Sequence, residues 1–514
     1  MAKKHDELYE LLHNLSPAEK RYVRIFATRQ APQNKAGYLK LFDLLLSIDE
    51  YDEDKINKRL AGSGRKKQLP TDKNYLYNFV LKAMRSFHEE KTVDTQLREM
   101  LISASFLYEK RLYEQALKLL SKAKRVAMQY DKSTMLLEVL FLESRNLIEK
   151  KAKNQRSLLD KVHAQAEHAL QQLNEEWPLI MCQQKTFVLH RSRFILRTPE
   201  LVEELQHIAD PEKLLAGLDV SKFNSAYYRL VTMALYWQCL GRNDQAVAVY
   251  EQLIELWEKH PDKKEEASIQ HKKHLTNYLS VCHSVGRYDH YPGLLKQITA
   301  IPCLSREEEA EQFQNIRFME LLFILNTDRL NELDELASVI SAGLVQYKTK
   351  INKARELAFY YNLAVGYFLL HRWKDALKWV DAIMLAGQTD HRQDIQNFSR
   401  LFRLILLYES DKHELLEYDL INAERFLRSR KSWFAFESKV VRHIKRLIDM
   451  EQGDKKTLFL KFNSALEEEM NNGKPASLGL SEVSYWSRST LENIPMDVLL
   501  KTDARNQKER AKSV

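Results

Sequence analysis

The residues best suited to chemistry are basic side chains near the N-terminus. Residues 55–91 carry ten lysines and arginines but only three acidic residues. Clustered cationic side chains bind phosphate groups, so this segment is a candidate contact for nucleic acid. The candidate binding residues are those around a glycine-rich turn and the helix after it: Lys58, Arg59, Arg65, Lys66, Lys67 and Lys73.

This segment has two interpretations. A short helix, a basic loop and a longer helix with Lys73 and Lys82 could form a helix-turn-helix or winged-helix variant. However, Tyr75 and Leu76 are explained by packing into a core, and the loop exceeds the three or four residues of that motif. We therefore favour a basic packing or docking domain, with DNA or RNA binding as the alternative.

Other combinations of reactive residues lack the spacing that catalysis requires. The run Gly62 to Lys67 does not match GxxxxGK[ST] and follows no strand, so it is no Walker loop. His271 and His274 could share a helix face, but no third ligand has metal spacing. Cys282 and His283 are adjacent in a helix, so their side chains point apart. We expect no catalytic, metal or cofactor site and predict that the chain is not an enzyme.

The composition indicates which elements position these residues. The 514 residues include 13 glycines and 11 prolines, where average usage gives roughly 36 and 26. Few turn residues and few helix breakers imply long helices. Hydrophobic residues make up 44% and charged residues 29%, a balance typical of folded proteins. The predicted fold class is therefore all-α.

Charge and cysteine content indicate a cytoplasmic, soluble protein. The net charge of +8 permits contact with nucleic acid without requiring it. The four cysteines form no CxxC pair and lie in or beside apolar runs, so we expect buried free thiols. Asp6, Glu7 and Glu10 interrupt any apolar leader at the start. The most apolar runs are too short to span a membrane, so no membrane partner is expected.

The first predicted domain, residues 1–95, is helical and basic. A helix over 6–15 precedes one that begins at Ser16, where Glu19 completes a capping box by bonding the backbone N–H of the serine. A short helix covers 54–60. After the loop over 61–70, Thr71 is expected to cap a further helix.

The second predicted domain, residues 96–470, reads as a series of helix hairpins. The clearest covers 353–386, where apolar residues recur in steps of three and four and alanines allow close helix contact. Two further turns, at Gly241 and Gly286, share the pattern Gly-Arg-x-Asp, which indicates repetition. The third predicted domain, residues 471–514, is a C-terminal cap with a basic tail.

Three apolar blocks that precede the turn at Gly241 predict separate helices. They cover 135–147, 158–173 and 177–196. Thr198-Pro199 and Asp210-Pro211 then predict two helix starts, because proline suits the first helical position after a capping residue.

The hairpins resemble the tetratricopeptide (TPR) repeat in their order of small, aromatic and large apolar residues. The matching positions are Leu363, Ala364, Tyr367, Trp373, Ala376 and Val380; Ala104, Leu107, Tyr113, Ala116, Leu120 and Ala123; and Ala234, Trp237, Ala246, Tyr250 and Leu253. Gly241 and Gly286 are 45 residues apart, whereas the family repeat has about 34 residues. The resemblance therefore implies a TPR-like α-solenoid with long repeats.

This resemblance implies a binding function. Stacked hairpins present an extended surface that commonly holds a peptide or a partner helix. The positions of the TPR carboxylate clamp read Tyr361, Asn362 and Val365 here, so no clamp is expected. The favoured function is a non-catalytic scaffold or adaptor for protein or peptide partners. The alternative is a regulator with a nucleic-acid-binding N-terminal domain and a TPR-like sensor domain.

Overall fold

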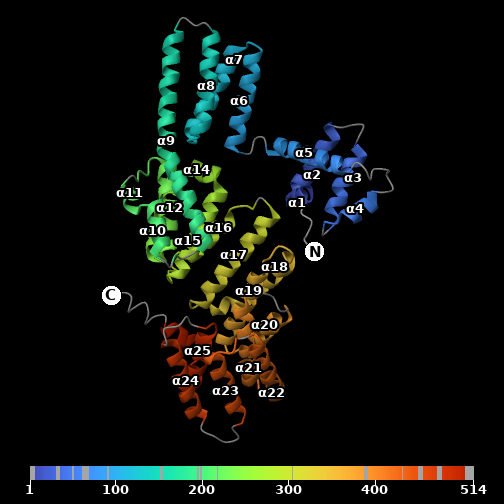
Figure 1. Ribbon diagram of the computed structural model, residues 1–514, viewed down its shortest axis with the longest axis vertical. Helices are drawn as coiled ribbons and strands as arrows, with labels where there is room; N and C mark the ends of the chain where they lie inside the picture. Colours follow the sequence, from blue (N-terminus) through green and yellow to red (C-terminus); the bar gives the residue numbers. More distant parts are fainter. Residues whose placement is uncertain are drawn as a thin grey trace. The chain divides into compact units, whose positions relative to one another are not determined.

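The computed structural model describes most of the chain. The described residues are 6–30, 35–48, 51–60, 69–88, 92–150, 154–193, 196, 199–216, 218–303, 305–386, 392–430, 432–449, 455–471 and 477–503. Every regular element within these ranges is a helix (Figure 1). The prediction of an all-α protein is thus confirmed for the described part of the chain.

The chain divides into two compact units, residues 1–308 and 309–514. Each unit is described by itself below. The predicted domain boundaries near residues 95 and 470 stay predictions.

Unit 1 begins with five helices that share one hydrophobic core. They are α1 (Glu7–Asn14), α2 (Pro17–Gln30), α3 (Lys35–Leu46), α4 (Glu53–Leu60) and α5 (Leu69–His88). Leu12, Phe42 and Val80 lie at the centre of this core, with no exposed surface. Burial of such side chains is the main stabilising contribution, about 1.5–3 kcal/mol each.

Side-chain capping was predicted at the start of two of these helices, α2 and α5. The backbone N–H of Ser16 donates to Glu19 Oε2 at 2.7 Å, and that of Glu19 donates to Ser16 Oγ at 3.3 Å. The predicted capping box is therefore confirmed. The predicted cap at Thr71 is wrong, because α5 begins at Leu69 and Thr71 lies within its first turn. Pro70 fits that turn since its missing N–H would have no helical acceptor.

The rest of unit 1 consists of helices that pack mainly on their neighbours in the chain. They are α6 (Val93–Glu109), α7 (Tyr113–Gln129), α8 (Ser133–Lys150), α9 (Gln155–Arg193), α10 (Pro199–Ile208), α11 (Pro211–Ala216), α12 (Phe223–Cys239), α13 (Asn243–Lys259), α14 (Pro261–Glu266), α15 (Ser268–Ser284) and α16 (Tyr291–Ala300). The predicted starts at Pro199 and Pro211 are confirmed, and the Asp210 carboxylate accepts a hydrogen bond from the backbone N–H of Glu212 at 3.1 Å.

One expectation about this region is wrong. The blocks predicted over 158–173 and 177–196 are a single helix, α9, which has 39 residues and contains Pro178. Proline removes one backbone hydrogen bond and crowds the preceding turn. Helix α9 packs against both α8 and α12, and this packing outweighs the local loss.

Unit 2 contains the hairpin that is clearest in the sequence. Its helices are α17 (Arg306–Leu325), the short 3₁₀ helix η2 (Leu330–Glu332), α18 (Leu333–Gln346), α19 (Lys353–Leu369), α20 (Trp373–Leu385), α21 (Gln393–Glu409), α22 (His413–Ser429), α23 (Ala435–Ile448), α24 (Lys455–Asn471) and α25 (Leu480–Glu492). Residues 496–503 are also helical. Glycines allow close approaches, since a Cβ on Gly343 would lie 2.1 Å from the ring of Phe313.

Six helix ends in the described residues have the same turn geometry. After the C-cap, one residue adopts a left-handed conformation with φ between 46° and 69°. The N–H of the following residue donates to the carbonyl five positions earlier, at 2.8–3.0 Å. This is the Schellman arrangement, which satisfies carbonyls at a helix end. The left-handed residues are Arg111, Asp131, Gly241, Gly286, His371 and Asp411.

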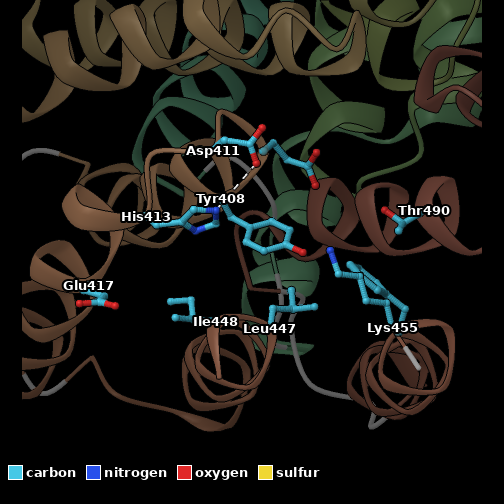
Figure 2. Close-up of a pocket in the computed structure, with 10 residues that line it drawn as sticks. Tyr408, Asp411, His413, Glu417, Leu447, Ile448, Lys455 and Thr490 are labelled. Atoms are coloured by element: carbon cyan, nitrogen blue, oxygen red, sulfur yellow. Dashed lines mark ion pairs between the residues drawn. The ribbon is translucent and has the colours of Figure 1, made fainter. Parts of the chain in front are cut away.

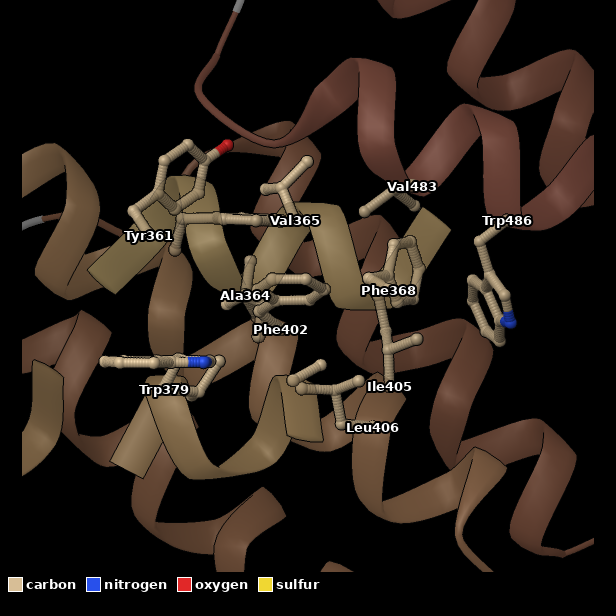
Figure 3. Close-up of a cluster of buried hydrophobic side chains, with 14 of the residues drawn as sticks. Tyr361, Ala364, Val365, Phe368, Trp379, Phe402, Ile405, Leu406, Val483 and Trp486 are labelled. Carbon is tan, nitrogen blue, oxygen red and sulfur yellow. The ribbon is translucent and has the colours of Figure 1, made fainter. Parts of the chain in front are cut away.

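The core of unit 2 joins the predicted hairpin to helices far away in the sequence. Figure 3 shows Phe368 of α19 close to Phe402 of α21, with Trp486 of α25 nearby. The rings of Phe368 and Phe402 meet edge to face at 4.9 Å. Tyr361 donates its hydroxyl to Glu482 at 2.6 Å. Residues 477–503 therefore pack back onto α19 and α21.

Candidate functional site

The predicted nucleic-acid contacts occupy different environments. Lys58 and Arg59 are exposed on α4, and neither forms an ion pair with another described residue. Arg65, Lys66 and Lys67 lie outside the described residues. The structure therefore leaves Lys58 and Arg59 accessible to a phosphate, while the prediction of nucleic-acid binding stays a prediction.

Lys73 has partners within the N-terminal helices. Its ammonium donates to the carboxylate of Asp6, the N-cap of α1, and to the hydroxyl of Tyr51 at 2.8 Å. Burial alone would lower the pKa of Lys73, but these two hydrogen bonds outweigh it and raise the pKa. Lys73 thus joins α5 to α1 and to the segment before α4, and a phosphate would have to displace these contacts.

A partly open cavity of about 710 Å³ in unit 2 has a mostly polar lining (Figure 2). It is bordered by α21, α22, α23, α24 and α25. Its lining combines acidic, basic and aromatic groups: Tyr408, Glu409, Asp411, His413, Glu417, Leu447, Ile448, Lys455, Phe459 and Thr490. None of these residues was predicted as a site residue.

Glu409 is a cavity residue whose carboxyl pKa is shifted by its surroundings. Burial raises the pKa of its carboxyl, although the hydrogen bond from Trp486 acts in the opposite direction. Trp486 Nε1–H donates to Glu409 Oε1 at 2.7 Å. This bond fixes α25 to the end of α21. A raised carboxyl pKa in a cavity is also common at functional sites.

The remaining polar groups of the cavity come from four of the surrounding segments. Asp411 and His413 lie 3.9 Å apart, and the ammonium of Lys455 lies 5.9 Å from the ring centre of Tyr408. Figure 2 shows the Tyr408 hydroxyl directed toward the side of the cavity that holds Lys455. The Thr490 hydroxyl donates to the carbonyl of Trp486 at 3.0 Å, so it is engaged by its own helix rather than activated by a base.

The two histidines considered as metal ligands are core residues of α15. His274 Nε2 lies 3.1 Å from the hydroxyl of Tyr227, and the ring of His271 lies 5.5 Å from that of Trp257. Burial lowers the pKa of each histidine to about 4. Within the described ranges, no group of three or more His, Cys, Asp or Glu side chains has the arrangement of a metal site.

The cysteines are free thiols, as predicted, but the prediction that all of them are buried is wrong. Cys239 and Cys282 are buried, whereas Cys182 and Cys303 are partly exposed. Burial raises the pKa of Cys239 to about 11, and that of Cys282 also rises because of burial. A raised pKa disfavours the reactive thiolate. His283 does not activate Cys282, since its Nδ1 lies 3.0 Å from the hydroxyl of Tyr288.

Among the described helices, none combines the length and the apolar character needed to cross a membrane. The chain matches no protein-family model, no curated protein and no solved structure.

Proposed function

We propose that this chain is a non-catalytic scaffold or adaptor, built as a TPR-like α-solenoid, that binds protein or peptide partners on its helical surface. The recurrent Schellman turn carries this proposal. The same backbone geometry ends six described helices, and in five cases the next helix begins two residues after the left-handed position. Repetition of one connection is what a series of similar hairpins requires.

Exposed apolar side chains supply a surface that a partner could cover. On α22, Leu415, Tyr418 and Ile421 follow one another at steps of three, with exposed fractions of 49%, 68% and 61%. Residues three apart lie on the same side of a helix. Single exposed apolar residues are ordinary, but a contiguous stripe is typical of an interaction site.

Partner capture with a surface variant tests this function. We would compare the wild-type chain with Tyr418→Glu/Ile421→Glu, using quantitative mass spectrometry of the proteins retained from lysate. The control variant, Glu467→Gln/Glu468→Gln, changes exposed polar residues of α24. We expect a stoichiometric partner with the wild type and the control but not with the glutamate variant. A monomer that retains no partner would contradict the proposal.

A nucleic-acid-binding regulator is the second candidate. The observation that favours it is the exposure of Lys58 and Arg59 without ion pairs to other described residues. Mobility-shift titration of the full chain at several salt concentrations tests it. Reversing these two charges should weaken binding and flatten its salt dependence. Absence of any shift at low salt would eliminate this candidate.

A further inference from the structure

An open groove of about 1270 Å³ runs between α9 and α10 in unit 1. The two helices lie together here, because the thiol of Cys182 on α9 donates to the carbonyl of Ile208 on α10 at 3.0 Å. Leu205 of α10 is fully buried. The groove is therefore built by packed secondary structure.

The α9 side of the groove is apolar and accessible. Met181 and Val188 both line it, and Val188 is 66% exposed. They are seven residues apart, or about two turns, so they lie on one helix face. Trp177 extends the same stripe by one turn and is also exposed. From Trp177 to Val188, these apolar side chains extend over about 16 Å of α9 at 1.5 Å per residue, and the exposed Gln184 and Lys185 lie between Met181 and Val188.

The α10 side of the groove is acidic. Glu200, Glu203 and Glu204 all line it and are exposed, at spacings that place them on one face of the helix. None of the three forms an ion pair with another residue that the structure describes. Lys185 is the only lysine or arginine in the lining. The rim therefore carries an excess of negative charge.

We infer that this groove receives a basic amphipathic helix of a partner protein. The apolar side of that helix would cover Met181 and Val188, and its lysines or arginines would face the three glutamates. The groove exceeds the roughly 300–1,000 Å³ of small-molecule pockets, and its length suits three turns of helix. This inference rests on the proposed binding function and specifies the chemistry of one partner.

A model peptide tests the inference directly. The probe is a fluorescein-labelled, 18-residue amphipathic helix of leucine and lysine, titrated with the full chain and followed by fluorescence anisotropy. The groove variant is Glu200→Lys/Glu203→Lys/Glu204→Lys. The control variant, Glu414→Lys/Glu467→Lys/Glu468→Lys, makes the same change in net charge at exposed positions of unit 2. Far-UV circular dichroism verifies that each variant keeps its helical content.

We expect the groove variant to raise the Kd at least tenfold and the control to change it less than twofold. Val188→Asp, which keeps the glutamates, should also raise the Kd severalfold. Equal weakening by the two lysine variants would show non-specific attraction and overturn the inference. Equal affinity for a leucine–glutamate peptide, or no binding by the wild type, would also overturn it. So would a dimer of this chain that the groove variant abolishes, because the groove would then hold a second copy.

These outcomes are separable from those of the proposed function. If partner capture depends on Tyr418 and Ile421 while the groove variant leaves the Kd of the peptide unchanged, the inference fails and the scaffold proposal stands. If no partner is captured but the peptide binds in the groove, the inference stands and the broader proposal loses its support.

Discussion

Replacing His443 with phenylalanine should make unit 2 more resistant to acid. His443 lies on α23 with 4% of its surface exposed, and its ring stacks on Phe462 at 3.9 Å with an interplanar angle of 4°. Its Nε2 forms no hydrogen bond with another described residue. Burial, followed by the charge of Arg446, lowers its pKa to about 3.

The size of the effect follows from proton linkage. An unfolded histidine has a pKa near 6.5, so below pH 6.5 the unfolded state binds a proton that the native state excludes. The stabilisation is complete above pH 6.5 and is lost as the pH falls toward 3. Between pH 6.5 and pH 4.5, the free energy of unfolding falls by 1.36 kcal/mol per pH unit, or about 2.7 kcal/mol in all. His443→Phe keeps an aromatic ring on Phe462 and removes this proton.

Hydrogen–deuterium exchange of α23 peptides in a urea series, at pH 7.5 and pH 4.5, measures the effect within unit 2. We expect the wild type to lose about 2–3 kcal/mol more than His443→Phe between the two pH values. His413→Phe is the control, because His413 is exposed on the neighbouring helix α22. An equal loss of stability in the wild type and His443→Phe would refute the assignment of a buried, neutral imidazole.

Further substitutions test three local features of the fold. Gly286→Ala and Gly293→Ala both add a methyl group to open space, but only Gly286 has a positive φ, of 69°. Gly286→Ala should lower the unfolding free energy by about 1 kcal/mol, whereas Gly293→Ala should raise it by about 0.5 kcal/mol. Urea denaturation measures both changes. Equal effects would argue against the left-handed turn. Pro178→Ala should raise the unfolding free energy of unit 1 by up to about 3 kcal/mol, because it restores a backbone hydrogen bond inside α9; a neutral result would mean that the helix is interrupted there. Lys73→Met should destabilise the N-terminal helices by about 1–2 kcal/mol and lower the thermal midpoint, since it leaves Asp6 without its ammonium partner. Lys58→Met, the control, should change the thermal midpoint little. Similar shifts of the midpoint in the two variants would contradict the structural role of Lys73.

Local signals in the sequence predicted the features that depend on neighbouring residues. The capping box of Ser16 and Glu19 is an interaction between residues three apart, so it can be read from sequence alone. The turns at Gly241 and Gly286 were recognised because glycine is the usual residue for a left-handed C-cap. The equivalent turn at Arg111 carries no such signal, because packing of the flanking helices imposes a conformation that an arginine side chain disfavours.

Features that depend on tertiary packing were not predictable in the same way. The apolar blocks over 158–173 and 177–196 predicted separate helices, and only the contacts of α9 with α8 and α12 explain why they form one continuous helix. The cavity of unit 2 collects side chains from Tyr408 to Thr490 on five helices, which no single periodic pattern reveals. The acidic face formed by Glu200, Glu203 and Glu204 has readable helical spacing, but its position beside Met181 and Val188 depends on how α10 packs on α9.

The binding function is tested most directly by the mass of a complex. Multi-angle light scattering would be performed on the purified chain mixed with the partner that it captures. The proposal predicts a discrete stoichiometric complex with the wild type and separate components with Tyr418→Glu/Ile421→Glu. The same complex with both proteins would contradict the role of the α22 surface, and separate components with the wild type would contradict the scaffold function itself.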